Sequence, residues 1–177
     1  MNEDSNRTKK LIIIRGNSSS GKTTLAKTLQ EELGYNTMII SQDIIKHDVF
    51  DDYSDKDVEV IELMIHLLRF GVKNIRYVIV EGIMNSDVYD VFFREAVKLY
   101  DENIHAYYFD LSIEETVRRH ENSKKASWFK SKDLYRWWKD DCLSIIHEKR
   151  ILKDMSIYDE TNMILHDIGY KKASVEE

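Results

Sequence analysis

Short runs of apolar residues alternate along the chain with longer stretches in which apolar residues recur every three or four positions. The runs are typical of buried strands, and the recurring positions are typical of helices that bury one face. We expect strands at residues 11–14, 36–41, 76–82, 105–112 and 149–153. Strands that alternate with helices predict an α/β fold with a mostly parallel sheet covered on both faces.

Three stretches have helical spacing, two of them between these strands and one after the last strand. The first follows the opening strand, where Leu25, Leu29 and Leu33 recur. A longer pattern begins at Val58, and we expect it to end at Gly71 because glycine commonly terminates helices. A last helix is expected from residue 156 toward residue 169.

The stretch GNSSSGKT, residues 16–23, lies between the first strand and the first helix. Two glycines followed by Lys and Thr at this spacing fit a phosphate-binding loop, whereas an ordinary Ser/Gly-rich turn would need none of these fixed positions. Glycine lets the backbone approach a phosphate, and the loop amides together with the helix N-terminus form an anion site. We therefore expect nucleotide contacts from Gly16, Asn17, Ser18, Ser19, Ser20, Gly21, Lys22, Thr23 and Thr24.

Two of these residues have specific predicted roles in the loop. Lys22 is expected to reach the β- and γ-phosphates of the nucleotide. The Thr23 hydroxyl is expected to ligate a magnesium ion that bridges the same oxygens. Both roles depend on a strand before the loop and a helix after it, which the pattern predicts.

The 177 residues suit one domain, residues 1–177, with a sizeable core. No apolar run approaches membrane length, and the N-terminus lacks the apolar region of a signal peptide, so we expect a cytoplasmic protein. Cys142 is the single cysteine, which excludes an intrachain disulfide, and we expect a core thiol. A net charge of −6 disfavours a protein whose main task is to grip duplex nucleic acid.

Acidic residues stand at the ends of two predicted strands, where ligands bind in parallel sheets. Asp43 follows the second strand and is a candidate base for an attacking hydroxyl, the alternative being an N-cap for the next helix. Glu81 ends the third strand and is a candidate to hold magnesium, directly or through water, or to contact the substrate. The alternative for Glu81 is an acid in solvent, but the YVIV before it predicts a central strand.

Two arginines, Arg118 and Arg119, follow the fourth strand on a helix that Ser112 and Glu115 are expected to open as a capping box. Phosphoryl transfer needs a cation on the transferring group and exclusion of water. We expect Arg119 to act as a lid arginine and Arg118 to contact substrate, in a lid region of about residues 112–139. The alternative is a solvated charged face.

The segment from residue 118 to residue 139 carries eight Lys or Arg, two acids and all three tryptophans of the chain. Interleaved basic and aromatic residues are typical of proteins that grip single-stranded nucleic acid. We favour the alternative, in which Tyr135, Trp138 and Cys142 form one helix face that docks into the core.

Several of these motifs resemble those of known kinases. IISQD (39–43) followed by VIVEGI (78–83) is similar to the order of motifs in uridine kinases, whose acid after the second strand activates the nucleoside hydroxyl. YYFDLSIEETVRRH (107–120) is similar to the strand-to-lid passage of polynucleotide kinases and of zeta-toxin-like and chloramphenicol phosphotransferase-like kinases. Over nearly its whole length, the chain thus resembles a small P-loop kinase.

The resemblance implies a three-layer αβα fold with a five-stranded parallel sheet and a helical lid. It also implies ATP and Mg²⁺ as cofactors and transfer of the γ-phosphoryl group to a hydroxyl of a small molecule, such as a nucleoside or an antibiotic. Adenine is expected near residues 153–156. The alternatives are a 5′-hydroxyl polynucleotide kinase and a P-loop regulatory ATPase; a GTPase switch is disfavoured because neither D-x-x-G nor N-K-x-D occurs.

Overall fold

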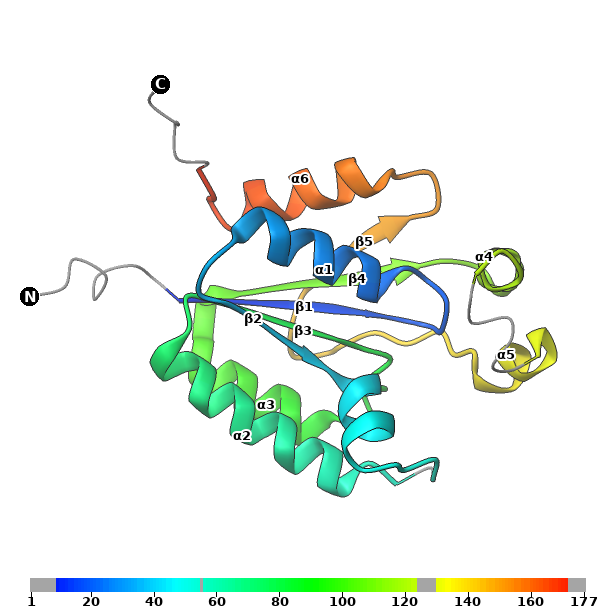
Figure 1. Cartoon of the computed structure of the whole chain (residues 1–177), viewed down its shortest axis with the longest axis horizontal. Coiled ribbons are helices and arrows are strands. Elements are labelled where there is room, and N and C mark those ends of the chain that lie inside the picture. The colour runs from blue at the N-terminus through cyan, green and yellow to red at the C-terminus, as the bar shows by residue number, and fades with distance from the viewer. Residues whose placement is uncertain (1–8, 55, 124–129, 172–177) are drawn as a thin grey trace, which may run out of the picture.

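Five parallel strands form one sheet at the centre of the molecule (Figure 1). The structure is a computed structural model that describes residues 9–54, 56–123 and 130–171. The strand order across the sheet is β2-β3-β1-β4-β5, so the predicted parallel sheet is confirmed. The strands are β1 (Lys10–Gly16), β2 (Thr37–Ser41), β3 (Tyr77–Gly82), β4 (Ile104–Asp110) and β5 (Glu148–Leu152).

Helices cover both faces of this sheet, which gives three layers (Figure 1). On one face lie α1 (Lys22–Leu33) and α6 (Ile157–Asp167), and on the other lie α2 (Val58–Asn74) and α3 (Asp90–Tyr100). Beyond these layers the chain forms a π-helix (Ile44–Val49), a 3₁₀ turn (Asp101–Asn103), α4 (Ile113–Glu121) and α5 (Ser131–Trp137). None of the helices in the described part of the chain combines the length and apolar composition that crossing a membrane requires.

The central strands read as continuous apolar runs because both of their faces are buried. In β1, Leu11 and Ile13 pack in the cluster under α2 and α3, whereas Ile12 and Ile14 pack in the cluster under α1. β3 lies between β2 and β1, which confirms the prediction that the strand ending in Glu81 is central. The carboxyl ends of the strands therefore meet at one edge of the molecule, where the phosphate loop begins.

The prediction that Gly71 ends the second helix is wrong, because α2 continues to Asn74. Gly71 lies buried inside the helix, where an added Cβ would stand 2.7 Å from Val78 Cγ2 and 3.1 Å from Met38 Cε. Glycine is present here for close helix-to-sheet packing and not for a turn. The α3 helix, which buries Phe92, Phe93, Ala96 and Tyr100, was not recognised in the sequence.

The predicted docking face of Tyr135, Trp138 and Cys142 is not formed. Helix α5 has seven residues and ends at Trp137, which is too short for positions 135 and 142 to share a face. Tyr135 is 60% exposed, Leu134 is the buried residue of α5, and Cys142 is exposed rather than a core thiol. Residues 124–129 of the basic and aromatic segment, with Trp128 and Phe129, lie outside the described residues.

Candidate active site

The loop between β1 and α1 has the backbone that its glycines predict. Gly16 has φ 145° and Gly21 has φ 115°, and Ser19 also has a positive φ of 61°. A Cβ at Gly16 would stand 2.9 Å from Phe109 Cβ, so a side chain at this position would collide with β4. Gly21 immediately precedes α1 and offers no side chain to cap its first amides. A loop with this conformation can place backbone N–H groups around an anion.

Polar groups of the loop are held mainly by the loop itself and by the segment after α5. Lys22 is 6% exposed, and its Nζ donates to the Asn17 carbonyl at 2.9 Å. The Asn17 side chain pairs with the backbone of Lys139, donating from Nδ2 at 2.7 Å and accepting at Oδ1 at 3.0 Å. Ser20 Oγ is buried and lacks a hydrogen-bond partner among the described residues, whereas Thr24 is exposed on α1.

The Glu81 carboxylate, at the end of β3, contacts side chains from α1 and β2 at the carboxyl edge of the sheet. It is 1% exposed, so the alternative of a solvent-facing acid is wrong. Its Oε2 accepts from Thr23 Oγ1 at 3.2 Å, and its Oε1 accepts from Ser41 Oγ at 2.5 Å. Ser41 and Glu81 are register partners in β2 and β3, and Thr23 begins α1, so the fold brings the two predicted metal-binding residues together.

A magnesium ion needs few protein ligands when nucleotide phosphates supply the rest. In the described part of the chain, no three His, Cys, Asp or Glu side chains form a group that could hold a metal alone. Thr23 and Glu81 provide a hydroxyl and a carboxylate beside the phosphate loop, which is the donor set of a phosphate-dependent magnesium site. The residues present therefore fit the implied metal.

Asp43 lies two residues past the end of β2, directly before the π-helix, and is half-buried. Its backbone is already helical, with φ −60° and ψ −43°, and its side chain makes no capping hydrogen bond to the π-helix. The N-cap alternative for this carboxylate is therefore not realised. Single π-helical turns occur often at functional sites.

The residues around Asp43 join the chain that follows β2 to the loop that follows β3. Gln42 Oε1 accepts from Ile83 N at 2.8 Å, and its Nε2 donates to the Tyr89 hydroxyl at 2.8 Å. Tyr89 in turn donates to Asp57 Oδ2 at 2.7 Å, and Lys46 pairs with the same carboxylate. Burial, and then the hydrogen bond to Asp57, raise the pKa of Tyr89 far above its usual range, so this phenol remains a donor.

The two lid arginines have different surroundings. Arg119 Nη1 donates to Ser20 O at 2.6 Å, and its Nη2 donates to Lys153 O at 3.3 Å, so it bridges the phosphate loop and the loop after β5. Arg118 has a 66% exposed side chain whose partner is Glu115, and the fold does not bring it to the loop. Hydrogen bonds from Arg118 and then Arg119 lower the pKa of Glu115 to about 2.

The predicted capping box is only half formed, because Glu115 pairs with the two arginines. Ser112 Oγ accepts from Glu115 N at 3.3 Å, as an N-cap should. The Glu115 carboxylate does not return the bond to Ser112, because its Oε1 accepts from both Arg118 and Arg119. Glu115 thereby holds Arg119 toward the phosphate loop.

Arg15 is a site residue that no sequence pattern indicates, since a single arginine at the end of an apolar strand carries no periodic signal. Its side chain is completely buried under the phosphate loop. Its Nε donates to Glu148 Oε1 at 2.9 Å and its Nη1 to Asp141 Oδ2 at 2.8 Å. Asp141 also accepts from Ser86 Oγ at 2.6 Å. Arg15 therefore ties residues 141–148 and the loop after β3 to the end of β1.

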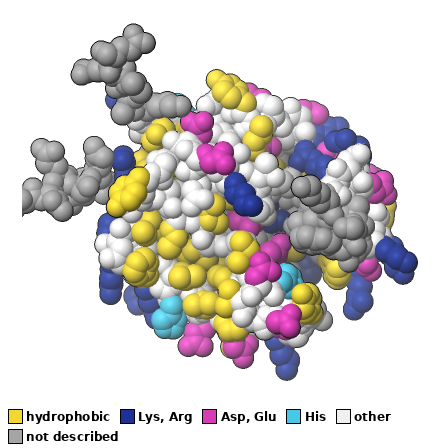
Figure 2. Space-filling view, viewed as in Figure 1, with side chains coloured by type: hydrophobic (Ala, Val, Ile, Leu, Met, Phe, Trp, Pro, Cys, Tyr) yellow, Lys and Arg dark blue, Asp and Glu magenta, His cyan; other side chains and the backbone are white. Residues whose placement is uncertain are grey.

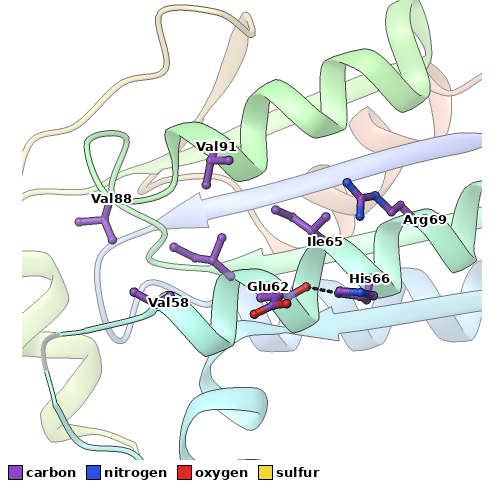
Figure 3. Close-up of a pocket in the computed structure, with 8 residues that line it drawn as sticks. Val58, Glu62, Ile65, His66, Arg69, Val88 and Val91 are labelled. Atoms are coloured by element: carbon purple, nitrogen blue, oxygen red, sulfur yellow. Dashed lines mark hydrogen bonds between the residues drawn. The ribbon is translucent and has the colours of Figure 1, made fainter.

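A cavity of about 460 Å³ lies away from these residues, between α2 and α3 (Figure 3). Val58, Ile65 and Arg69 of α2 face Val88 and Val91 across it. None of the predicted site residues lines this cavity, so we assign it no part in the chemistry despite its size.

Comparison with known proteins bears on the fold. No protein-family model and no curated protein sequence matches the chain. Among the solved structures that match nearly its full length are a gluconokinase from Sinorhizobium meliloti (14% identity, 92% of this chain and 93% of that chain, TM-score 0.64), the APS kinase of Mycobacterium tuberculosis in complex with AMPPNP and APS (15% identity, 90% of this chain and 96% of that chain, TM-score 0.65), and the tunicamycin resistance protein of Deinococcus radiodurans (15% identity, 92% of this chain and 97% of that chain, TM-score 0.63).

The chain shares the fold of the gluconokinase and the APS kinase. This confirms the predicted three-layer αβα architecture and, at the level of the fold, the resemblance to small P-loop kinases. In this fold, Lys22, Thr23, Asp43 and Glu81 lie at the carboxyl edge of the sheet, where parallel sheets bind ligands. At identities of 14–15% the similarity shows the fold alone, so the reaction has to be inferred from the residues of the site.

Proposed function

We propose that the protein is a cytoplasmic, ATP-dependent kinase that transfers the γ-phosphoryl group to a hydroxyl of a small molecule, with residues 1–177 as one kinase domain. The observation that carries this proposal is the contact of Thr23 with the buried Glu81 at 3.2 Å beside a glycine-built phosphate loop. Asp43 stands at the same edge of the sheet, two residues past the end of the neighbouring strand β2. A regulatory ATPase needs no such carboxylate for an acceptor.

The loop residues fit a nucleotide with magnesium. Gly16 to Thr23 would surround the phosphates, and a phosphate oxygen is the kind of partner that the buried Ser20 hydroxyl lacks. Thr23 and Glu81 would hold Mg²⁺, which when bound neutralises charge on the phosphate oxygens. Lys22 is positioned inside the loop by Asn17 O and adds a second positive charge.

Two residues act on the acceptor and the transferred group. Asp43 orients the acceptor hydroxyl and accepts its proton as the oxygen attacks. Arg119 neutralises charge on the transferring phosphoryl group. Its contacts to Ser20 O and Lys153 O support a nucleotide that extends toward residues 153–156, the expected position of adenine.

A second candidate, a 5′-hydroxyl polynucleotide kinase, is favoured by the surface of α5. Tyr135 is 60% exposed and Trp137 is 47% exposed, and Lys132 and Arg136 beside them are exposed as well. Exposed aromatic and basic side chains together can stack bases and contact phosphates. The net charge of −6 opposes this candidate.

A transfer screen with γ-labelled ATP and Mg²⁺ tests the proposal. The acceptors are nucleosides, aminocyclitol and amphenicol antibiotics, sugars and 5′-hydroxyl oligonucleotides. We expect label on a small molecule with the wild type and none with Lys22→Ala, whose triphosphate affinity should also fall in calorimetry. Label on oligonucleotides alone would establish the second candidate, and ATP hydrolysis without transfer to any acceptor would indicate a regulatory ATPase.

A further inference from the structure

A groove with a volume of about 290 Å³ runs along the edge strand β2, between α1 and α2. On the face where these helices flank β2, Figure 2 shows hydrophobic side chains gathered over β2 and α2. The apolar lining of the groove consists of Ala26, Ile39, Ile40, Ile44, Ile45 and Leu67. At one end the lining changes to Thr23, Ser41 and Glu81, so the groove is continuous with the candidate metal site.

The size and polarity of the groove define what can occupy it. A cavity of about 150 Å³ holds a benzene molecule, so about 290 Å³ accepts an aromatic ring with a short alkyl chain. Besides Glu81, Lys27 is the charged residue of the lining, and the Gln30 amide is engaged with Thr37 O at 3.1 Å. Because six of the eleven lining residues are apolar, and Thr23, Ser41 and Glu81 lie together at one end, the groove favours an apolar group along most of its length.

The position of the groove separates it from the expected position of adenine. Arg119 and Lys153 lie at the β4 and β5 side of the phosphate loop, whereas the groove lies at β2, the opposite edge of the sheet. Ser41 and Ile44 of the lining flank Asp43 in the chain. A molecule in the groove therefore reaches the reaction centre from the side of the acceptor base.

We propose that this groove binds the apolar arm, an aromatic ring or a short alkyl chain, of an acceptor alcohol whose hydroxyl lies beside Asp43. The proposal rests on the proposed kinase function and names its acceptor class. In the transfer, the alcohol oxygen forms a bond to the γ-phosphorus, the bond from that phosphorus to the β–γ bridging oxygen breaks, ADP leaves, and the hydroxyl proton passes to Asp43.

The first experiment measures occupancy of the groove without nucleotide. Methyl NMR of the full chain is recorded with 2-phenylethanol and, as the matched alcohol without the arm, with ethanol. We expect 2-phenylethanol to shift the methyl signals of Ile39, Ile44 and Leu67, and ethanol to leave them unchanged. Shifts confined to methyls outside the groove would overturn the proposal.

The second experiment measures transfer to the same two alcohols. We expect kcat/KM for 2-phenylethanol to exceed that for ethanol by roughly 10- to 100-fold, as an apolar pocket typically discriminates. Leu67→Trp fills the groove and should abolish this preference. Phe70→Trp, at a 52% exposed position of the same helix outside the groove, should retain it.

A third variant covers the case in which Leu67→Trp does not fold. Ile44 is 48% exposed, and Ile44→Ala removes lining atoms without demanding space, so it should reduce the preference roughly tenfold. Equal kcat/KM for both alcohols, or a preference that these variants do not change, would overturn the groove assignment while leaving the kinase proposal intact.

Two further results would also overturn the proposal that the groove binds an acceptor alcohol. Methyl shifts in the groove without transfer to any acceptor would overturn the proposed function and with it the acceptor role of the groove. A wild-type dimer in sedimentation that Leu67→Trp dissociates would assign the groove to a second copy of the chain.

Discussion

At the scale of single residues, the site is built around carboxylates whose surroundings differ. Glu81 is 1% exposed and accepts from two hydroxyls, one on α1 and one on β2. Asp43 is half-buried and makes no capping bond. A fully buried carboxylate held from two sides suits a fixed, positioning role, while a carboxylate that retains contact with solvent can exchange a proton.

The first prediction distinguishes a base from a structural acid at position 43. Asp43→Asn keeps the shape of the side chain and removes the proton acceptor, so transfer to the acceptor should fall by roughly 10² to 10⁴. Slow hydrolysis of ATP should fall less, because water does not require this base. The assay is the ratio of transfer to hydrolysis in both proteins. An unchanged ratio with full transfer would remove Asp43 from the mechanism and make Glu81 the candidate.

A second prediction concerns Glu160, which is 5% exposed on α6. Burial raises the pKa of Glu160 to about 7, even though Arg119 nearby lowers it. The folded chain thus binds this proton more tightly than the unfolded chain, so the stability it contributes is present below about pH 4.5 and is lost as the pH rises through 7.

Glu160→Gln stays neutral and should escape this loss. We expect the variant to gain about 1–3 kcal/mol over the wild type in free energy of unfolding between pH 5 and pH 8. Urea unfolding at both pH values measures it, with Glu62→Gln at an exposed position of α2 as the control. Parallel pH dependence of wild type and Glu160→Gln would contradict the prediction.

At the scale of elements, α4 presents neighbouring arginines with different partners. Arg119 reaches the phosphate loop and the loop after β5, and Arg118 pairs with Glu115 on the surface. The helix turn separates two adjacent side chains by about 100°, which is why only one of them can face the loop. The lid function proposed for α4 therefore concentrates on Arg119.

The third prediction compares these two arginines directly. Arg119→Ala should lower kcat by roughly 10³- to 10⁵-fold, the range for arginines that stabilise phosphoryl transfer. Arg118→Ala is the matched control and should stay near the wild-type kcat, because its loss removes a surface ion pair. A large loss in Arg118→Ala with none in Arg119→Ala would assign the lid arginine to position 118.

The elements also show where sequence patterns succeed. The positions of the strands could be predicted from apolar runs because β1 and β3 are buried on both faces. The phosphate loop could be predicted because its eight residues are consecutive in the sequence and act together. The prediction for Gly71 is wrong because glycine serves tight packing as well as helix ends, and only the distance to Val78 decides between the two roles. The Gln42 to Tyr89 contact spans 47 positions, so no local pattern could reveal it.

At the scale of the whole molecule, residues 139–148 connect the lid region to the sheet, and side chains of β1 and of the phosphate loop hold them in place. Asn17 holds the backbone of Lys139, and Arg15 holds Asp141 and Glu148. The Arg15 guanidinium also lies 5.4 Å from the centres of the Phe93 and Tyr108 rings. A buried arginine with two carboxylates keeps this irregular segment against the phosphate loop.

The fourth prediction tests that attachment. Arg15→Met leaves two acids beside the core without their cation, and breaking a buried pair in this way costs about 3–5 kcal/mol of unfolding free energy. Arg94→Met removes an exposed pair with Asp90 and should cost far less, because solvent screens an exposed ion pair. Urea unfolding at pH 7 compares the two variants. Equal small losses would mean that Asp141 and Glu148 find solvent when Arg15 is removed.

The strand order β2-β3-β1-β4-β5 places β2 and β5 at opposite edges of the sheet. If acceptor recognition belongs to the β2 side and nucleotide recognition to the β4 and β5 side, residues 39–67 can diverge without disturbing the phosphate loop. Such a division is a route to new specificities by gradual mutation. It also makes the molecule suitable for engineering, because a library confined to the apolar lining residues of the β2 groove would sample acceptors while every member keeps Thr23, Ser41 and Glu81.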